Sequence, residues 1–325
     1  VAFGVEKEEL EASFKYQILG GTASLLILLG IIMLYWYTKT LNMADVSKYL
    51  QAGAHDHFIL FVELLLIAGF GLKAAMIPFH AWLPDAHSSA PSPISAMLSG
   101  VLIKAIGIYA ILRLFFNMLP LSVDIAWLIT IIGTLSMIIG VFLAIGQWDV
   151  KRLLAYHSIS QMGYVVIGAG IGMIVLAEGG DKEVAAMAIA GGLFHLINHA
   201  VFKGLLFLNA GAVEYTTGTR DLKKLGGLWS SMPVTTSTSL GASMSISGIP
   251  PFNGFFSKLL IIIAAVKAGQ YTIGILAVIV SIITLASFLK VQKFGFFGKS
   301  NFSKAIREVP FAMCFSMIVL ALLCL

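Results

Sequence analysis

The chain has 325 residues, of which 58% are hydrophobic and only 11% charged, against roughly 45–50% and 25% in an average soluble domain. So few charges could not cover the surface of a water-soluble globule, and the composition therefore excludes that class and indicates a protein dissolved in a lipid bilayer. The net charge of +5 is interpreted as a signal of membrane topology and not as a nucleic-acid-binding surface. Cys314 and Cys324 both lie in the last apolar run, which excludes a disulfide framework and a cysteine-based metal site.

The first fifteen residues are acidic and lack the basic region and cleavage site of a signal peptide. Because the sequence starts without Met and stops inside an apolar run, we expect a piece of a longer protein. A spanning helix needs about 20 apolar residues, and the runs of that kind do not alternate in polarity, which predicts an all-α polytopic membrane protein and not a barrel. The nine candidate spans are 16–37, 58–79, 92–116, 124–147, 152–175, 184–212, 232–266, 271–290 and 309–325.

Two of these spans carry proline inside and are predicted to be broken helices. The break in 58–79 contains Pro78, and the break in 232–266 contains Pro250 and Pro251. Proline lacks the backbone N–H and clashes with the preceding turn, so carbonyls near residues 74 and 246–247 lose their helical partners. Such breaks survive in a bilayer only where protein or a water-filled cavity satisfies them, and paired breaks are typical of inverted-repeat transporters.

Lysine spacing supports such a repeat, because Lys73 precedes Lys104 by 31 residues and Lys258 precedes Lys290 by 32. The basic residues outside the spans predict the orientation. One side holds eleven: Lys7, Lys15, Lys151, Arg152, Arg220, Lys223, Lys224, Lys293, Lys299, Lys304 and Arg307. The other side holds five: Lys39, Lys48, Arg113, Lys182 and Lys267. This excess places the N-terminus of the segment in the cytoplasm.

Five lysines remain inside spans. A lysine at the centre of a spanning helix costs about 2.5–3.5 kcal/mol on insertion scales, so packing alone does not explain it. Lys290 lies near its helix end and is expected to reach the interface. The other four are interpreted as functional: Lys73, Lys104, Lys203 and Lys258. Lys73 and Lys258 lie beside the two helix breaks.

The sixth span adds a row of titratable groups, His195, His199 and Lys203. Residues four apart fall on one helical face and rise by about 6 Å a step, so the three groups stack along the membrane normal. Two histidines at this spacing can also hold zinc, but no Glu follows the first, and a protonated lysine is a poor ligand. A proton or cation relay fits better, with histidines that only bond to polar neighbours as the alternative.

Glu63 is the only acidic residue in the interior of a span, since Asp124 lies at the very start of its span and the others lie in loops. Its position about two turns into the second span allows either a place at the membrane interface or a place on the ionic path. Four residues follow Pro78 in a predicted loop, where anchoring at the interface is the favoured role. They are His80, Trp82, Asp85 and His87.

Five motifs resemble the antiporter-like, proton-translocating subunits shared by respiratory complex I, Mrp sodium/proton antiporters and energy-converting membrane-bound hydrogenases. They are FGLKAAMIPFHAWLPDAH (70–87), APSPISAMLSGVLIK (90–104), KRLLAYHSISQMGY (151–164), FHLINHAVFKGLLF (194–207) and GIPPFNGFFSK (248–258). The resemblance implies an inverted-repeat bundle in which this chain supplies helices 6 to 14. Residues 1–117 would end the first repeat with three spans, 118–295 would form the second with five, and 296–325 would hold a loop and a final, truncated span.

The resemblance also implies roles for single residues. Lys73 matches the lysine of the family's broken helix 7, and Lys104 the helix 8 lysine, with Ser99 where some members have histidine. The trio in the sixth span matches the helix 11 relay, and Lys258 matches the lysine of broken helix 12. In the family these groups form a hydrated polar axis at the membrane midplane. The family's helix 5 glutamate would lie upstream of Val1, and Glu63 is a weak substitute.

These observations predict an ion-translocating, non-catalytic subunit of a complex I-related respiratory complex, such as a membrane-bound hydrogenase, in a prokaryotic cell membrane. The sequence carries no nucleotide, flavin, iron–sulfur or nickel motif, so any redox chemistry would belong to a peripheral arm. The expected partners are further membrane subunits, antiporter-like ones included, the lipid bilayer, and H⁺ or Na⁺, with no cofactor or metal in this chain. An Mrp antiporter subunit without a redox partner is the alternative. A small-solute carrier would offer substrate-shaped polar pockets, and a structural scaffold would not explain four deep lysines.

Overall fold

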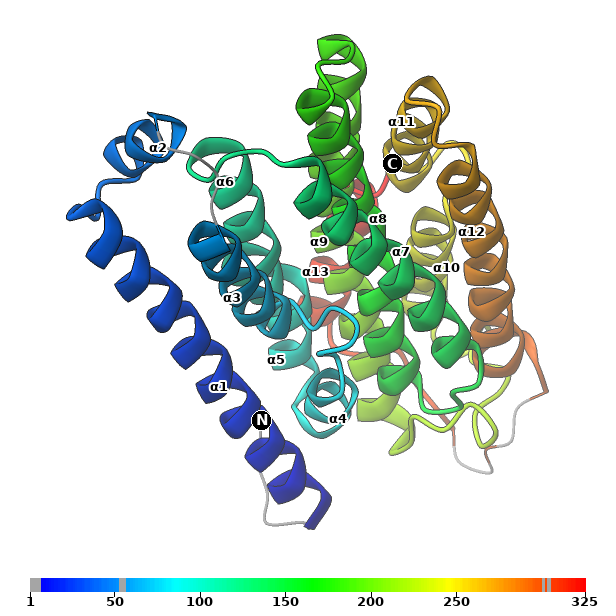
Figure 1. Cartoon of the computed structure of the whole chain (residues 1–325). Coiled ribbons are helices and arrows are strands. Elements are labelled where there is room, and N and C mark those ends of the chain that lie inside the picture. The colour runs from blue at the N-terminus through cyan, green and yellow to red at the C-terminus, as the bar shows by residue number, and fades with distance from the viewer. Residues whose placement is uncertain (1–6, 53–56, 300–301, 303–304) are drawn as a thin grey trace.

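The computed structural model describes residues 7–52, 57–299, 302 and 305–325, and these residues form a bundle of helices (Figure 1). Six of the described helical segments are long and apolar enough to cross a membrane. They are α1 (Lys7–Thr38), the continuous run of α5 (Ser92–Met97), η1 (Leu98–Tyr109) and α6 (Ala110–Asn117), α7 (Val123–Ile145), α8 (Val150–Ala177), α9 (Lys182–Thr217), and α12 (Tyr271–Val291) with η2 (Gln292–Phe297). The predicted all-α polytopic membrane fold is therefore confirmed.

The remaining helices are shorter, and they include the halves of the two predicted broken spans. They are α2 (Met43–Ala52), α3 (His57–Lys73), α4 (Trp82–Ser89), α10 (Pro233–Ser247), α11 (Asn253–Lys267) and α13 (Phe311–Leu322). Pro78 lies in the break between α3 and α4, and Pro250 and Pro251 lie in the break between α10 and α11. Gly248 ends α10 in the left-handed region with φ +78°, a conformation that glycine adopts without steric cost. Both predicted breaks are confirmed.

The span predicted at 92–116 differs from a plain α-helix. Its middle part, η1, has π-helical hydrogen bonding over Leu98–Tyr109. No proline marks this change, so the sequence offered no signal for it. Such wide turns occur often at functional sites, and this one carries Ser99 and the backbone of Lys104.

Side-chain caps fix where three of the long helices begin. The Ser122 hydroxyl accepts from the Ile125 N–H at the start of α7, and the Asp149 and Asp181 carboxylates accept from N–H groups in the first turns of α8 and α9. Glu308, which is far away in sequence, accepts from the Val234 and Thr235 N–H groups at the start of α10. Each cap satisfies a donor that the helix itself leaves unpaired.

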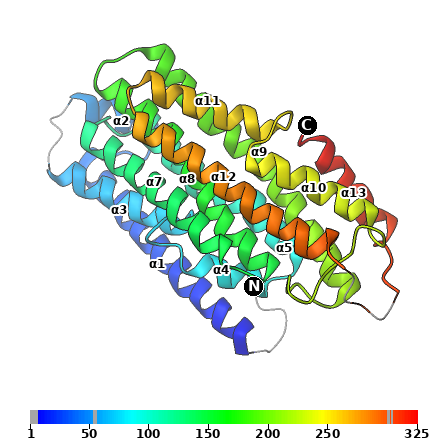
Figure 2. The same ribbon diagram turned by 90° about the vertical axis from the view of Figure 1, so that its right-hand side faces the viewer.

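Helix α8 lies at the centre of the bundle, with α7 on one side and α9 on another (Figures 1 and 2). Nearly all of its residues are buried. Glycines let α7 and α8 approach closely. A Cβ added at Gly163 would lie 2.5 Å from the Met137 nitrogen and 2.6 Å from the Gly133 oxygen. Small residues at helix contacts are typical of membrane bundles, in which packing drives association.

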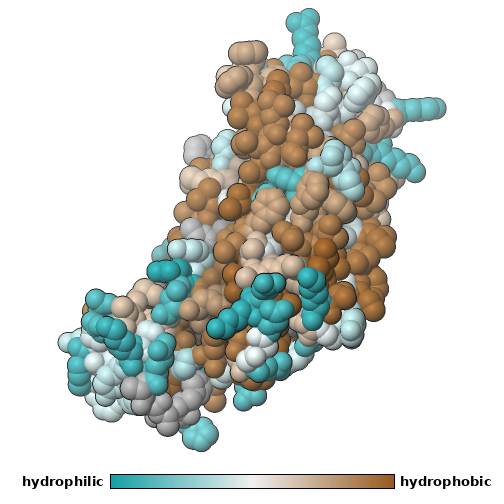
Figure 3. Space-filling view, turned by 90° about the horizontal axis from the view of Figure 1, so that it is seen from above, coloured by the Kyte–Doolittle hydropathy of each residue, from teal (hydrophilic) through white to brown (hydrophobic). Residues whose placement is uncertain are grey.

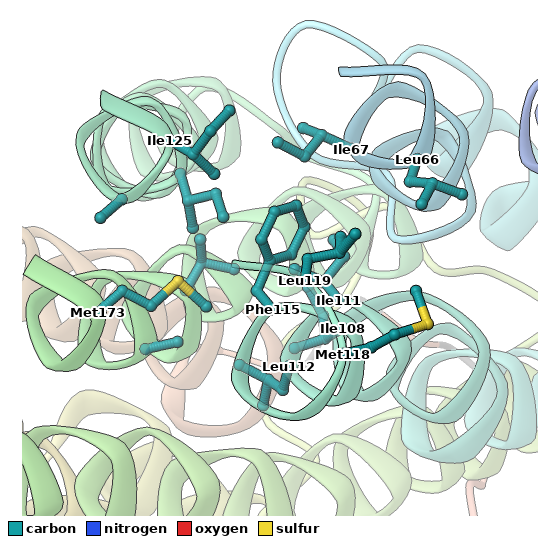
Figure 4. Close-up of a cluster of buried hydrophobic side chains, with 14 of the residues drawn as sticks. Leu66, Ile67, Ile108, Ile111, Leu112, Phe115, Met118, Leu119, Ile125 and Met173 are labelled. Atoms are coloured by element: carbon teal, nitrogen blue, oxygen red, sulfur yellow. The ribbon is translucent and has the colours of Figure 1, made fainter. Parts of the chain in front are cut away.

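Apolar side chains fill the space between the helices in several clusters. Figure 4 shows one of them, in which Phe115 lies among side chains from neighbouring helices. This cluster joins α3, η1, α6, α7 and α8, and its other labelled members are Leu66, Ile67, Ile108, Ile111, Leu112, Met118, Leu119, Ile125 and Met173. The cluster holds the first part of the chain against the central helix.

The outer surface also carries many large apolar side chains. Trp36, Phe142 and Ile282 are 65%, 59% and 62% exposed on α1, α7 and α12. In Figure 3, brown hydrophobic side chains form a broad area across the visible face, and hydrophilic ones gather in separate groups, most of them toward its edges. An apolar exterior of this extent suits contact with lipid and not with water.

Candidate functional site

The three titratable groups predicted in the sixth span, His195, His199 and Lys203, lie on α9. This titratable trio faces the interior of the bundle. His195 and Lys203 have no exposed surface, and His199 is 1% exposed. His195 bridges two other helices, since its Nδ1 lies 2.9 Å from the Ser257 Oγ on α11 and its Nε2 lies 3.2 Å from the Gln161 Oε1 on α8. The shared buried face agrees with the prediction from their spacing.

Lys203 ends a short series of polar contacts that crosses three helices. Its Nζ donates to the Leu154 carbonyl on α8 at 2.5 Å, and the Ser158 hydroxyl reaches the same oxygen at 3.2 Å. The Ser158 Oγ lies 2.9 Å from the Ser99 Oγ on η1. Neutral hydroxyls and one carbonyl therefore connect η1, α8 and α9 through buried polar atoms.

Lys258 lies one turn after the start of α11 and is 3% exposed. Its Nζ donates to the Ile246 carbonyl at 2.8 Å, and this carbonyl is one of those that the prolines of the break were predicted to release. The Nζ also lies 4.6 Å from the centre of the Tyr164 ring, within the range of a cation–π contact. In the part of the chain that the structure describes, no carboxylate lies within ion-pair distance of Lys258.

Lys73 ends α3 at the other break and lies apart from these groups. Its half-buried side chain donates to the Gly20 carbonyl on α1 at 3.1 Å. Tyr16, Trp82 and Leu102 line the same cavity of about 90 Å³. The structure thus places Lys73 at the contact of α1 with the first broken helix, and the described contacts do not join it to Lys203 or Lys258.

Three further predicted residues have different surroundings. Glu63 on α3 is fully buried within the bundle. Lys290 donates to the Ile145 and Gln147 carbonyls at the end of α7, both at 2.6 Å, as expected for a lysine that reaches a helix end. Lys104 lies in η1, but its side chain is outside the described part of the structure.

The predicted role of anchoring at the membrane interface is wrong for two of the four residues that follow Pro78, namely Trp82 and His87. Trp82 is 5% exposed and donates its indole N–H to the Leu72 carbonyl at 3.0 Å, so it satisfies the last turn of α3. His87 is fully buried, and its ring stacks on Phe207. Asp85 forms ion pairs with Lys15 and Arg152. These contacts hold the break against the bundle, which hydropathy alone does not reveal.

The structure adds four polar residues on α8 to the site. His157, Ser158, Gln161 and Tyr164 all lie buried along this helix. The Tyr164 hydroxyl donates to the Ala277 carbonyl and lies 2.8 Å from the Ser281 Oγ on α12. None of them is a lysine inside a span or shares a helical face with one, so the sequence did not single them out. The spacing of His157 and Gln161, four apart in an apolar run, was the available signal.

The groups of this arrangement are chemically able to pass on protons or to hold small cations. Lysine and histidine can gain and lose a proton, and a buried site disfavours the charged form of a lysine. Hydroxyls, an amide and carbonyls between them can hold a moving cation by hydrogen bonds or coordination. Ionisable residues inside a membrane bundle commonly mark an ion path.

Comparison with known proteins places the chain in one family. Residues 1–284 match the family described as NADH:quinone oxidoreductase/Mrp antiporter, TM. Among curated relatives, the chain is 36% identical over 304 residues to a Na(+)/H(+) antiporter subunit of Alkalihalophilus pseudofirmus, covering 93% of this chain and 59% of that protein. It is 35% identical over 335 residues to Hydrogenase-4 component B of Escherichia coli, covering 98% and 49%. The chain thus spans about half the length of these relatives.

Solved structures agree with the sequence matches. The fold is similar to a chain of the membrane-bound sulfane sulfur reductase, an archaeal respiratory membrane complex, with TM-score 0.88 and 32% identity over 99% of this chain and 52% of that one. A chain of the Mrp complex from Dietzia gives TM-score 0.87 and 28% identity, covering 98% and 65%. With the matched residues and the buried lysine–histidine site in agreement, this chain belongs to the NADH:quinone oxidoreductase/Mrp antiporter family of membrane subunits.

Proposed function

We propose that this chain is an ion-translocating subunit of a complex I-related respiratory membrane complex, such as a membrane-bound hydrogenase. It moves protons, or protons and sodium ions, through a relay of buried lysines and histidines. The observation that carries this proposal is that the Lys203 and Lys258 ammonium groups are both buried and both donate to backbone carbonyls. A buried cation costs too much to serve packing alone.

The experiment that tests the proposal is a Lys203→Met substitution in the intact complex, reconstituted into proteoliposomes. The substitution keeps an unbranched side chain of related size but removes the transferable proton, so we expect proton movement, measured with a pH-sensitive dye, to fall by at least about tenfold. Lys224→Met, at an exposed lysine in the loop after α9, is the control. Transport at the unsubstituted rate in an assembled Lys203→Met complex would refute the proposal. Parallel uptake of radioactive sodium distinguishes the two ions.

The second candidate is a subunit of an Mrp-type sodium/proton antiporter without a redox partner. The 36% identity to the Na(+)/H(+) antiporter protein of Alkalihalophilus pseudofirmus favours it, whereas the similarity to a hydrogenase component and to a respiratory reductase favours the first. Isolation of the intact complex under mild detergent decides between them. A peripheral redox arm among the co-purified subunits supports the respiratory complex, and an assembly of membrane subunits alone supports the antiporter.

The proposed setting is a prokaryotic cell membrane, with the N-terminus of this segment in the cytoplasm and other membrane subunits alongside. The excess of basic residues on one side supports this orientation. In a Lys224→Cys variant, we expect a membrane-impermeant maleimide to label the new thiol from the cytoplasmic side only. Cys314 and Cys324 are buried, so the unsubstituted chain serves as the control, and labelling from outside would reverse the orientation.

A further inference from the structure

His157 is a buried histidine on the central helix α8 that belongs to the candidate site but has no role yet in the proposed relay. Its side chain has no exposed surface. The Nε2 atom lies 2.8 Å from the Ser287 Oγ on α12, and the ring packs against Phe288 with 4.8 Å between centres. Its Nδ1 has no hydrogen-bond partner among the described residues. One ring nitrogen is thus directed at a hydroxyl of another helix, and the second remains available for a proton.

The surroundings of His157 connect it to the relay. Lys203 is bonded to the Leu154 carbonyl, about one helical turn before His157 on the same helix. About one turn after it, Gln161 contacts His195. His157 therefore lies on the buried face of α8 between the two ends of the α9 trio.

From Ser287, which contacts His157, helix α12 continues toward one end of the bundle. Ser287 and Lys290 are three residues apart, a spacing that puts them on neighbouring positions of one helical face. Lys290 is bound to the Ile145 and Gln147 carbonyls, at the end of α7 where the chain turns into α8. Figure 1 shows that α12 ends on the same side of the bundle as this turn. Lys290 is only partly buried, so it connects the interior with the surface there.

We propose that His157 and Ser287 form a branch of the relay that carries protons between the buried Lys203 and Lys258 and the surface lysine Lys290. The inference rests on the proposed function and adds the route by which protons reach the membrane face at the α7–α8 turn. A proton received at the Nδ1 of His157 from a lysine ammonium makes the ring an imidazolium. The donating lysine is left as a neutral amine. The ring becomes neutral again when its Nε2 proton passes to Ser287 Oγ as the hydroxyl hands its own proton on to Lys290, which accepts it as the neutral amine after releasing a proton at the surface. One proton moves, and no electron is transferred.

The test compares two substitutions of Ser287 that differ by one hydroxyl. Threonine and valine have nearly the same shape and add the same bulk to this fully buried position, so packing costs are matched. In the intact complex in proteoliposomes, we expect Ser287→Thr to retain the normal rate of proton transport. We expect Ser287→Val to lower this rate by about tenfold or more. His157→Gln keeps a hydrogen-bonding group but cannot carry the proton, and we expect a loss of the same size.

The control is Thr284→Val on the same helix. Thr284 is equally buried, but its hydroxyl bonds back to the Val280 carbonyl of its own helix, so its loss should leave transport unchanged. Equal transport by Ser287→Thr and Ser287→Val, or unchanged transport by His157→Gln, would overturn the branch. If Lys203→Met alone abolishes transport, the proposed function stands and only the branch fails. If Lys203→Met also transports normally, the proposed function itself fails.

Discussion

A Lys258→Met variant is expected to lose proton transport by at least about a hundredfold, near the lower end of the range for a group that transfers protons directly. The Lys258 Nζ is the donor to the Ile246 carbonyl at the break between α10 and α11. Methionine fills the same space without a proton to transfer and without a charge to bury. The measurement is the initial rate of proton movement in proteoliposomes that contain the intact complex.

Lys267→Met provides the matched control, because Lys267 lies on the same helix but in its exposed last turn. We expect it to transport at the unsubstituted rate. A Lys258→Met complex that assembles fully and moves protons normally would show that the buried ammonium has only a structural role. Thermal unfolding of both variants in detergent separates loss of the ion path from loss of the fold.

Gly163→Leu is expected to prevent stable packing of α7 against α8. The stability of the fold should fall by more than about 3 kcal/mol, the upper end of typical overpacking penalties. A Cβ at this position would already lie within 2.6 Å of backbone atoms of α7, which cannot move aside as a flexible side chain can. The whole leucine side chain would force the two helices apart. We expect the chain to be absent from the assembled complex in native gels and to be degraded in the membrane.

Gly21→Leu is the control for the added bulk and hydrophobicity. Gly21 is exposed on α1, and a Cβ there would meet no atom within 4 Å. This variant should assemble and transport normally. Assembly of Gly163→Leu at the normal level would contradict the close approach of α7 and α8 on which the position of the α8 polar residues depends.

The helical membrane fold could be predicted from sequence because the bilayer imposes a length and a composition on every crossing. The two broken helices could be predicted as well, since Pro78 and Pro250 remove backbone donors wherever they occur. The π-helical turns of η1 could not, because Leu98–Tyr109 contains no residue whose backbone chemistry requires them.

The site was predicted at its buried lysines and at the two histidines that share a helical face with Lys203, and it was missed on α8. Lys203 and Lys258 stood out because a charge in an apolar run is costly, and both are buried beside polar partners. His157 and Gln161 belong to the same polar interior, but neutral side chains in a hydrophobic helix give little signal. The Trp82 bond to the Leu72 carbonyl was missed because it depends on how the chain turns after Pro78.

The partner of Lys258 has a consequence for how many ions the site holds at once. The Ile246 carbonyl belongs to the last turn of α10, where the helix dipole gives a partial negative charge of about −0.5 but the helix carries no net charge. A protonated Lys258 therefore remains positive overall. A second cation about 10 Å away would be repelled by about 1.7 kcal/mol at an effective dielectric constant of about 20. In the proposed ion path, occupancy of neighbouring positions would thus be anticooperative, and each arriving ion would favour departure of the one ahead of it, as in single-file conduction.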